Sequence, residues 1–155
     1  MSDSDSLDLI DGFAAILVAN VPGAAYHLDT PYVAGELGIF NMLLPASPDE
    51  CITLTWVPQS ENPADPSGTG LLQVRARGAA NKPRRPVEIL DQVGSAFLGA
   101  THIPIGDSGL EIIQVTSRVR VPMGMDDSKR WDWSDNYTLD VYYTPTLLRP
   151  AAGWD

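Results

Sequence analysis

The chain has 155 residues, of which 44% are apolar and 19% charged, and its formal net charge is −10 at pH 7. This size and composition are typical of one globular domain with its own core, and they exclude an intrinsically disordered chain. The negative charge argues against general binding to nucleic acid, because that affinity comes mainly from cations set against phosphates.

The charge is unevenly distributed along the chain. Residues 1–74 contain ten Asp and Glu and no Lys or Arg, whereas residues 75–155 contain ten of each sign. Half of the positive charge lies within residues 71–90, "LLQVRARGAANKPRRPVEIL". This distribution favours contact between unlike charged surfaces, including those of two copies of the protein. The clustered cations are Arg75, Arg77, Lys82, Arg84 and Arg85.

No membrane segment or secretory signal is recognisable. There is no run of about 18 apolar residues, and the start, "MSDSDSLDL", is acidic where a secretory signal is basic and then apolar. We therefore expect a protein of the cytosol of the cell that makes it. The single cysteine, Cys51, cannot form an internal disulfide, and its apolar setting predicts a buried thiol rather than a nucleophile.

The first predicted element is a helix over residues 7–20, "LDLIDGFAAILVAN". Ser and Asp residues at its start suit an N-cap and an acidic first turn, and Pro22 ends it. One face of this helix has apolar residues at helical spacing and is expected to face the core. These residues are Leu9, Phe13, Ile16 and Leu17.

Two strands are predicted next, over residues 38–44 and 51–57, and the second alternates apolar with polar residues. Residues 58–70, "PQSENPADPSGTG", contain three prolines and two glycines and predict a long mobile loop. We expect it to project as an arm that joins two antiparallel strands; a tolerated surface insertion is the alternative.

Residues 71–77 are predicted as the returning strand. Because side chains alternate along a strand, its apolar and polar residues separate onto two faces. The apolar face comprises Leu72, Val74 and Ala76, and the face open to solvent or a partner comprises Gln73, Arg75 and Arg77.

The most regular pattern is that of a helix over residues 86–98, which Gly99 ends. Lys82, Arg84 and Arg85 stand at its start, where the helix dipole prefers acids by about 0.3–1 kcal/mol each. Because these three cations stand where the helix dipole disfavours positive charge, they indicate an acidic partner nearby. The polar stripe of this helix is Glu88, Asp91, Gln92 and Ser95, and the opposite side is Val87, Leu90, Val93, Phe97 and Leu98.

The last third of the chain predicts strands over residues 101–105, 110–122 and 136–143, with a polar connection over 123–135 and a loosely ordered tail over 145–155. Arg118 and Arg120 share one face of the middle strand.

The order helix, strands, helix, strands predicts one α+β domain over residues 1–155. We expect a mainly antiparallel or mixed sheet with both helices on one face. The other face is left with arginines and hydroxyls, which would be solvated in a monomer and could form an interface in a ring.

Nothing in the sequence predicts catalysis, a metal or a cofactor. His27 and His102 are far apart and neither has a ligand spacing. Acids crowd residues 126–135, but their register is not that of a calcium loop, and Lys129 and Arg130 would repel the ion. No phosphate-binding or dinucleotide-binding glycine motif is present.

Four segments in chain order resemble the minor capsid or tail terminator proteins of long-tailed bacteriophages, over roughly residues 7–144. They are "LIDGFAAIL", "LPASPDECITLTWVPQ", "LQVRARGAANKPRRPVEILDQVGSAFLG" and "RVRVPMGMDDSKRWDWSDNYTLDVYY". The proline-aspartate turn before a strand, the arginine-bearing strand and the closing hairpin are the most specific of these features. The segment 58–70 and the tail have no counterpart in the resemblance.

This resemblance implies a small structural virion protein that forms a hexameric ring on the end of a finished tail tube. Its partners would be the tail tube protein and a head-completion or neck protein, and it would be assembled in the host cytoplasm. DNA would pass through the lumen without specific binding, which suits a net acidic chain. No membrane or enzymatic activity is implied.

We therefore predict an interface between subunits or with a partner ring, formed by Arg75, Arg77, Lys82, Arg84, Arg85, Arg118 and Arg120. The alternatives are a head-side neck or connector protein, a minor tail protein, or a small non-viral adaptor that binds a partner through residues 58–70.

Overall fold

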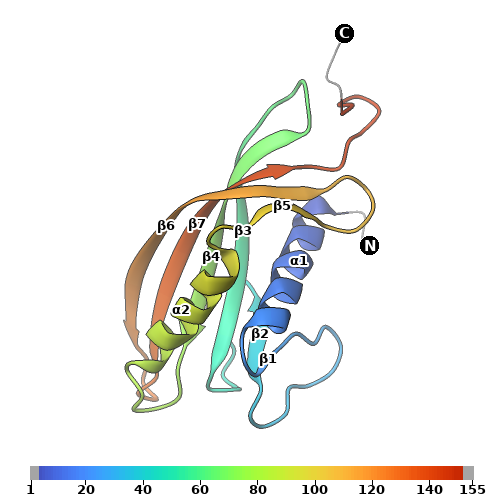
Figure 1. The fold of residues 1–155 in the computed structure, drawn as a ribbon. Coiled ribbons are helices and arrows are strands. Elements are labelled where there is room, and N and C mark those ends of the chain that lie inside the picture. Colours follow the sequence, from blue (N-terminus) through green and yellow to red (C-terminus); the bar gives the residue numbers. More distant parts are fainter. Residues whose placement is uncertain (1–3, 152–155) are drawn as a thin grey trace.

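The computed structural model describes residues 4–151, which fold into two helices and one seven-stranded sheet (Figure 1). The strand order is β1-β2-β3-β4-β7-β6-β5; β1–β2 and β2–β3 pair in parallel and the other neighbours are antiparallel. This is the predicted α+β fold with a mixed sheet. The elements are α1 (Asp5–Asn20), β1 (Ala24–Ala25), β2 (Leu37–Asn41), β3 (Cys51–Glu61), β4 (Ser67–Arg77), α2 (Arg85–Phe97), β5 (Thr101–Pro104), β6 (Glu111–Met125) and β7 (Trp131–Tyr142).

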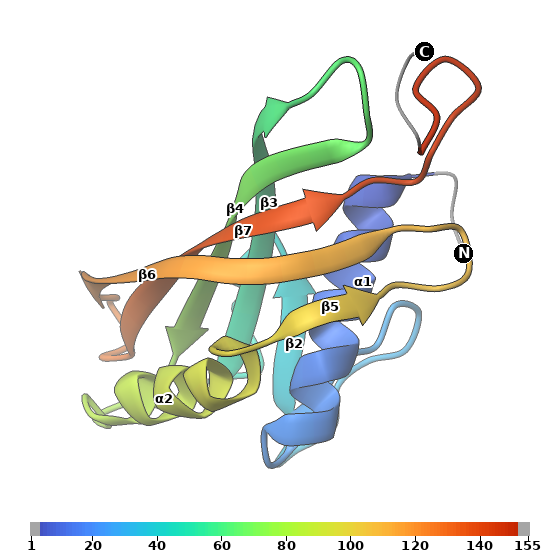
Figure 2. The ribbon, with the colours of Figure 1, turned by 45° about the horizontal axis from the view of Figure 1, so that its top comes forward.

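Both helices cover one face of the sheet, as predicted. Helix α1 packs on β3, α2 packs on β4 and β7, and the helices contact each other (Figures 1 and 2). Neither described helix is long and apolar enough to cross a membrane.

Helix α1 begins two residues before the predicted start. The side chain of Ser4 accepts a hydrogen bond from the Leu7 N–H at 3.3 Å, so Ser4 is the N-cap. Leu9, Phe13 and Leu17 are buried as predicted, because their spacing places them on the same side of the helix.

Four aromatic rings connect the helices with the sheet. The ring centroids of Trp56 and Phe13 are 5.9 Å apart, those of Phe13 and Phe97 are 5.9 Å apart, and those of Phe97 and Tyr137 are 5.5 Å apart. The row therefore passes from β3 through α1 and α2 to β7. Packing at these distances adds to the hydrophobic stabilisation by about 0.5–1.5 kcal/mol per pair.

The predicted long loop over residues 58–70 is wrong in extent. Strand β3 continues to Glu61 and β4 begins at Ser67, so the connection is only residues 62–66. Strand β2 pairs with β3 only as far as Leu54, so Pro58 lies where one edge of β3 has no neighbouring strand. Its missing N–H therefore costs no hydrogen bond on that edge. A register shift between Pro58 and Ser60 then lets the pairing with β4 continue. The predicted antiparallel joining of the two strands is confirmed, and the hairpin projects beyond the rest of the sheet (Figure 1).

The glycines that suggested a loop there have a packing role instead. A Cβ at Gly70 would lie 2.3 Å from the Trp56 ring, and one at Gly68 would lie 2.7 Å from the Tyr143 ring. Because the two rings cover the strand so closely, these positions in β4 take glycine.

The predicted polar connection over residues 123–135 is also too long. Strand β6 extends to Met125 and β7 begins at Trp131, which leaves a turn of residues 126–130. The Asp126 carboxylate closes this turn by accepting from the N–H groups of Ser128 and Arg130, both at 3.0 Å. These bonds and the Arg130 guanidinium lower the pKa of Asp126. A tight turn closed by the Asp126 side chain is therefore found in place of the expected irregular segment.

Smaller differences concern segments with weak patterns. Strand β1 has only two residues and was not predicted, and β2 ends at Asn41. Helix α2 ends at Phe97, and Leu98, predicted as part of its apolar side, is the C-cap and is 47% exposed. Ile89, which was not predicted on that side, is fully buried. Residues 152–155 of the predicted tail lie outside the described residues, whereas Thr146 and Arg149 close a turn within it.

Candidate interaction surfaces

The predicted basic segment begins on the open face of β4, away from the helices. Arg75 pairs there with Asp132 of the neighbouring strand β7. Arg77 is only 4% exposed, because its guanidinium donates to the main-chain oxygens of Pro48 and Asp49 at 2.7 and 2.8 Å. Both arginines lie on the predicted face of the strand, but contacts within the chain occupy them.

Arg85 and Arg130 hold the same acidic segment. Arg85 Nε lies 3.0 Å from Glu50 Oε2. Arg130 Nη1 donates to the Ala46 oxygen at 2.7 Å and to Asp49 Oδ1 at 3.0 Å. Segment 46–50 of the acidic first half therefore meets the basic second half inside one copy. Arg130 was not predicted to take part, because its partners are more than 80 residues away and no local pattern connects them.

Arg118 and Arg120 share one face of β6 as predicted, but it is the helix side and not the open face of Arg75. The guanidinium of Arg120 donates to both oxygens of the fully buried Asp135, at 2.7 and 2.9 Å, and reaches Asp91 of α2 at 2.8 Å. The hydrogen bond to Asp135 raises the pKa of Arg120. The physical reason for this placement is that a buried carboxylate requires a counter-charge.

Arg118 also contacts α2. A Cβ at Gly94 would lie 2.5 Å from a guanidinium nitrogen of Arg118, so the side chain crosses the helix at its glycine. Within the described chain, Arg118 and Arg120 thus fasten α2 to the sheet; their predicted part in an interface stays a prediction.

The remaining cations of the predicted segment are free of such contacts. Lys82 and Arg84 are exposed, and among residues 4–151 their side chains form no hydrogen bond or ion pair. The same holds for Lys129, whose turn is joined to theirs by the Asn81 N–H donating to the Lys129 oxygen at 2.9 Å. A pocket of about 480 Å³ lies beside Lys82 and Arg84. We call Lys82, Arg84 and Lys129 the basic end.

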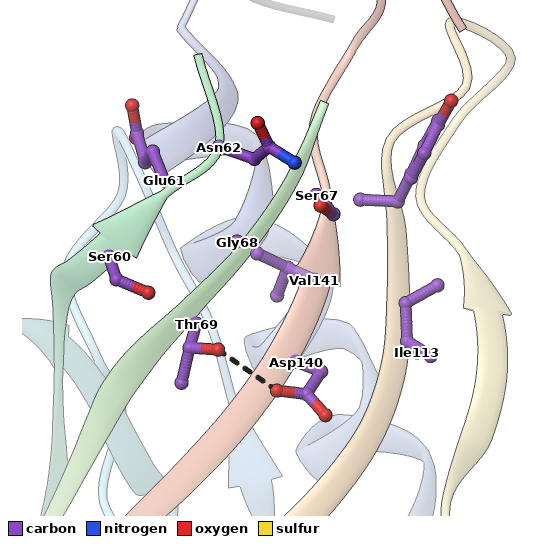
Figure 3. Close-up of a pocket in the computed structure, with 10 residues that line it drawn as sticks. Ser60, Glu61, Asn62, Ser67, Gly68, Thr69, Ile113, Asp140 and Val141 are labelled. Carbon is purple, nitrogen blue, oxygen red and sulfur yellow. Dashed lines mark hydrogen bonds between the residues drawn. The ribbon is translucent and has the colours of Figure 1, made fainter. Parts of the chain in front are cut away.

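A polar groove lies at the tip of the β3–β4 hairpin and the adjoining end of β7 (Figure 3). It has a volume of about 480 Å³, and the carboxylate in it is that of Asp140. Glu61 also borders the groove, but it pairs with Gly68, so its side chain lies on the helix side of the sheet, near Arg149. Asp140 accepts from Thr69 Oγ1 at 3.0 Å and from Gln114 Nε2 at 2.8 Å. The hydroxyls of Ser60, Ser67 and Thr69 also line the groove.

The histidines of the described chain each lie beside one acid. His27 Nε2 lies 2.7 Å from Glu36 Oε2, and His102 Nδ1 lies 2.9 Å from Glu111 Oε1, so each histidine pairs with one local acid. Among the described residues, no group of three or more His, Cys, Asp or Glu could hold a metal ion. Cys51 is fully buried, as predicted.

The family model described as bacteriophage tail terminator protein matches residues 17–143, which is most of the chain. No curated protein matches. One solved structure is similar over 69% of this chain and 79% of that one, at 13% identity and a TM-score of 0.45, a likeness too low to carry an argument. The chain belongs to the bacteriophage tail terminator protein family, and its role is a structural one in the phage tail.

Proposed function

We propose that the protein terminates the phage tail. Copies of the chain form a ring, hexameric in the form that the family resemblance implies, at the head-proximal end of the tail tube. The ring stops polymerisation of the tube and joins it to the head-completion proteins. The observation that carries this proposal is the family match, which extends from the last turn of α1 to the residue after β7.

The distribution of surface chemistry supports self-assembly of this kind. A ring uses contacts between two different patches of one chain, and the rotation between copies closes it. The fold carries a basic end and, at the tip of the β3–β4 hairpin, a polar groove with the carboxylate of Asp140, so two chemically different surfaces are present. Binding surfaces rather than reacting groups are what a terminator requires, and the protein acts without catalysis or a cofactor.

The charges also suit a ring through which DNA passes. Most arginines are already paired with carboxylates of the same chain, and the net charge is −10, so DNA phosphates gain little by contacting the protein. The paired arginines are Arg75, Arg85, Arg120, Arg130 and Arg149.

Removal of the gene from the phage genome tests the proposal. We expect overlong tails or tails without heads in negative-stain micrographs of the lysate, and tails of normal length when the gene is supplied from a plasmid. Free tails of normal length beside filled capsids would instead identify a head-side connector. Normal virions would contradict both roles.

A further inference from the structure

The chain after β7 forms a closed turn over residues 146–149, with two exposed leucines at its tip. The N–H of Thr146 donates to the main-chain oxygen of Arg149 at 3.0 Å, and the N–H of Arg149 donates to that of Thr146 at 3.3 Å. Leu147 and Leu148, between them, are 96% and 74% exposed. Tight turns usually take Gly, Pro, Asn, Asp or Ser. A single exposed apolar residue is ordinary, but two adjacent ones at a turn tip suit a contact with another protein. We call residues 146–149 the leucine turn.

Contacts at its base hold the leucine turn in place. The guanidinium of Arg149 lies over the Tyr143 ring, 5.6 Å from its centroid, and pairs with Glu61 at the end of β3 at 3.7 Å. Thr144, just before the turn, donates to the Asp5 carboxylate from its N–H at 2.9 Å and from its hydroxyl at 2.6 Å. A binding element that is already held in one conformation loses little conformational entropy when it docks.

A pocket of matching chemistry has a volume of about 480 Å³, and none of the residues that line it is charged. We call it the uncharged pocket. The groove at the hairpin tip and the pocket beside the basic end contain charged side chains instead, which leucines would remove from water without offering a hydrogen bond. Of these three, the uncharged pocket is the one that suits the leucine turn. Its lining residues are Pro31, Tyr32, Val33, Ala34, Ser47 and Pro48.

The leucine turn and the uncharged pocket cannot meet within one copy. The turn is tied to Glu61 at the end of β3, whereas Pro48 of the pocket lies shortly before Cys51, where this strand begins. Ten residue steps at about 3.3 Å each separate the ends of β3 by roughly 33 Å. The segment after β7 and the loops before β2 and β3 accordingly lie at opposite ends of the molecule (Figure 1).

We propose that Leu147 and Leu148 of one copy insert into the uncharged pocket of the next copy. This inference rests on the proposed function, because a ring requires contact between two different patches of one chain, and it names those patches. An open row of copies keeps one leucine turn and one pocket free, and these meet when the ring closes. The contact removes the two leucines from water and gives the segment after β7 a role in assembly.

Disulfide trapping tests the contact directly. Leu148→Cys is combined with Val33→Cys, at an exposed residue of the pocket, in assembled tails and in concentrated purified protein. The native thiol of Cys51 is fully buried and does not interfere. A disulfide requires Cα atoms within about 7 Å, so the new thiols can join only between copies. We expect oxidation to give a ladder of covalent oligomers. The control Leu148→Cys with Val18→Cys, at an exposed residue of α1, should give none.

Charge substitution provides the second arm. Leu148→Asp and Val33→Lys should each weaken association of the copies by about tenfold or more, because each places an unpaired charge in an apolar contact. Both changes in one chain should restore part of the association, because opposite charges then face each other. Circular dichroism and thermal unfolding of each variant check that the fold is retained, as expected for exposed positions.

Absence of a ladder in assembled tails, an equal ladder in the control, or a double variant no better than the single variants overturns the proposed contact. So does a Leu148→Asp chain that still forms rings but no longer joins a tail or head protein, because the leucine turn would then bind that protein. If the contact fails while loss of the gene still gives overlong tails, the proposed function stands and a different surface joins the copies. If a ladder forms while tails are normal without the gene, the contact stands and the proposed function fails.

Discussion

The Cys51 side chain is fully buried among residues that include Arg77 and Arg130. Burial raises the pKa of its thiol from 9.0 to about 11, although both arginines act in the opposite direction. The folded chain therefore holds this proton more tightly than the unfolded chain does. Between about pH 9 and about pH 11 the free energy of unfolding should fall as the pH rises, by up to roughly 1.4 kcal/mol per unit.

Urea unfolding at pH 8 and pH 10.5 measures this loss, with Cys51→Ala as the control. The pKa values of Tyr26 and Tyr137 are also raised, to about 12. Both tyrosines are present in the wild-type chain and in the variant, so their effect on the stability cancels in the comparison. The wild-type chain should lose more stability than the variant. Equal losses would show that the thiol is not the responsible group.

A second effect at the residue scale concerns Arg120. Its replacement by alanine leaves Asp135, which has 0% exposure, without a counter-charge. We expect Arg120→Ala to lower the free energy of unfolding by about 3–5 kcal/mol. The matched control is Arg84→Ala at an exposed arginine, which should change it by less than about 0.5 kcal/mol. Equal effects of the two changes in denaturant unfolding would contradict the assigned role.

The basic end is unfavourable for the isolated fold. Arg84 is the N-cap of α2 and makes no capping hydrogen bond with its side chain. Lys82→Glu and Arg84→Glu should therefore each raise the free energy of unfolding, by about 0.3–1 kcal/mol at low salt, because acids suit this end of a helix. Lower stability in these variants, measured at low and high salt, would refute the idea that the cations are kept for binding.

At the scale of elements, the row of aromatic rings connects the helices with the sheet. Phe13 is 1% exposed and contacts both Trp56 and Phe97. We expect Phe13→Ala to cost about 3–5 kcal/mol of stability. Val18→Ala, on the same helix at a residue 44% exposed, is the control and should cost little. A small loss for Phe13→Ala would mean that α1 contributes little to the core.

Sequence periodicity predicted these elements well where one face is apolar. The face of β4 with Leu72, Val74 and Ala76 and the helix over 86–98 are both found in the structure. Element ends were harder to predict, because Pro58 and the glycines of β4 are loop signals in isolation. In the folded chain these residues fit within strands, because Pro58 lies at a free strand edge and the glycines lie under the Trp56 and Tyr143 rings. Both are tertiary features, which the local sequence does not show.

For the whole molecule, the sequence predicted contact between the acidic first half and the basic second half of the chain. The structure shows such contacts within one copy. Segment 46–50 is bound by Arg77, Arg85 and Arg130. Such pairs cannot be predicted from the sequence, because their partners are far apart along it. What remains for a neighbour is a smaller set of cations, Lys82, Arg84 and Lys129.

In the role proposed above, this protein stops the growth of the tail tube. The most direct measurement is the length of tail tubes that polymerise in lysates of phage lacking the gene, with and without added purified protein. We predict that tubes supplied with the protein stop growing at its addition and keep a fixed length distribution, while untreated tubes continue to lengthen. Continued growth at the same rate in both samples would contradict the claim.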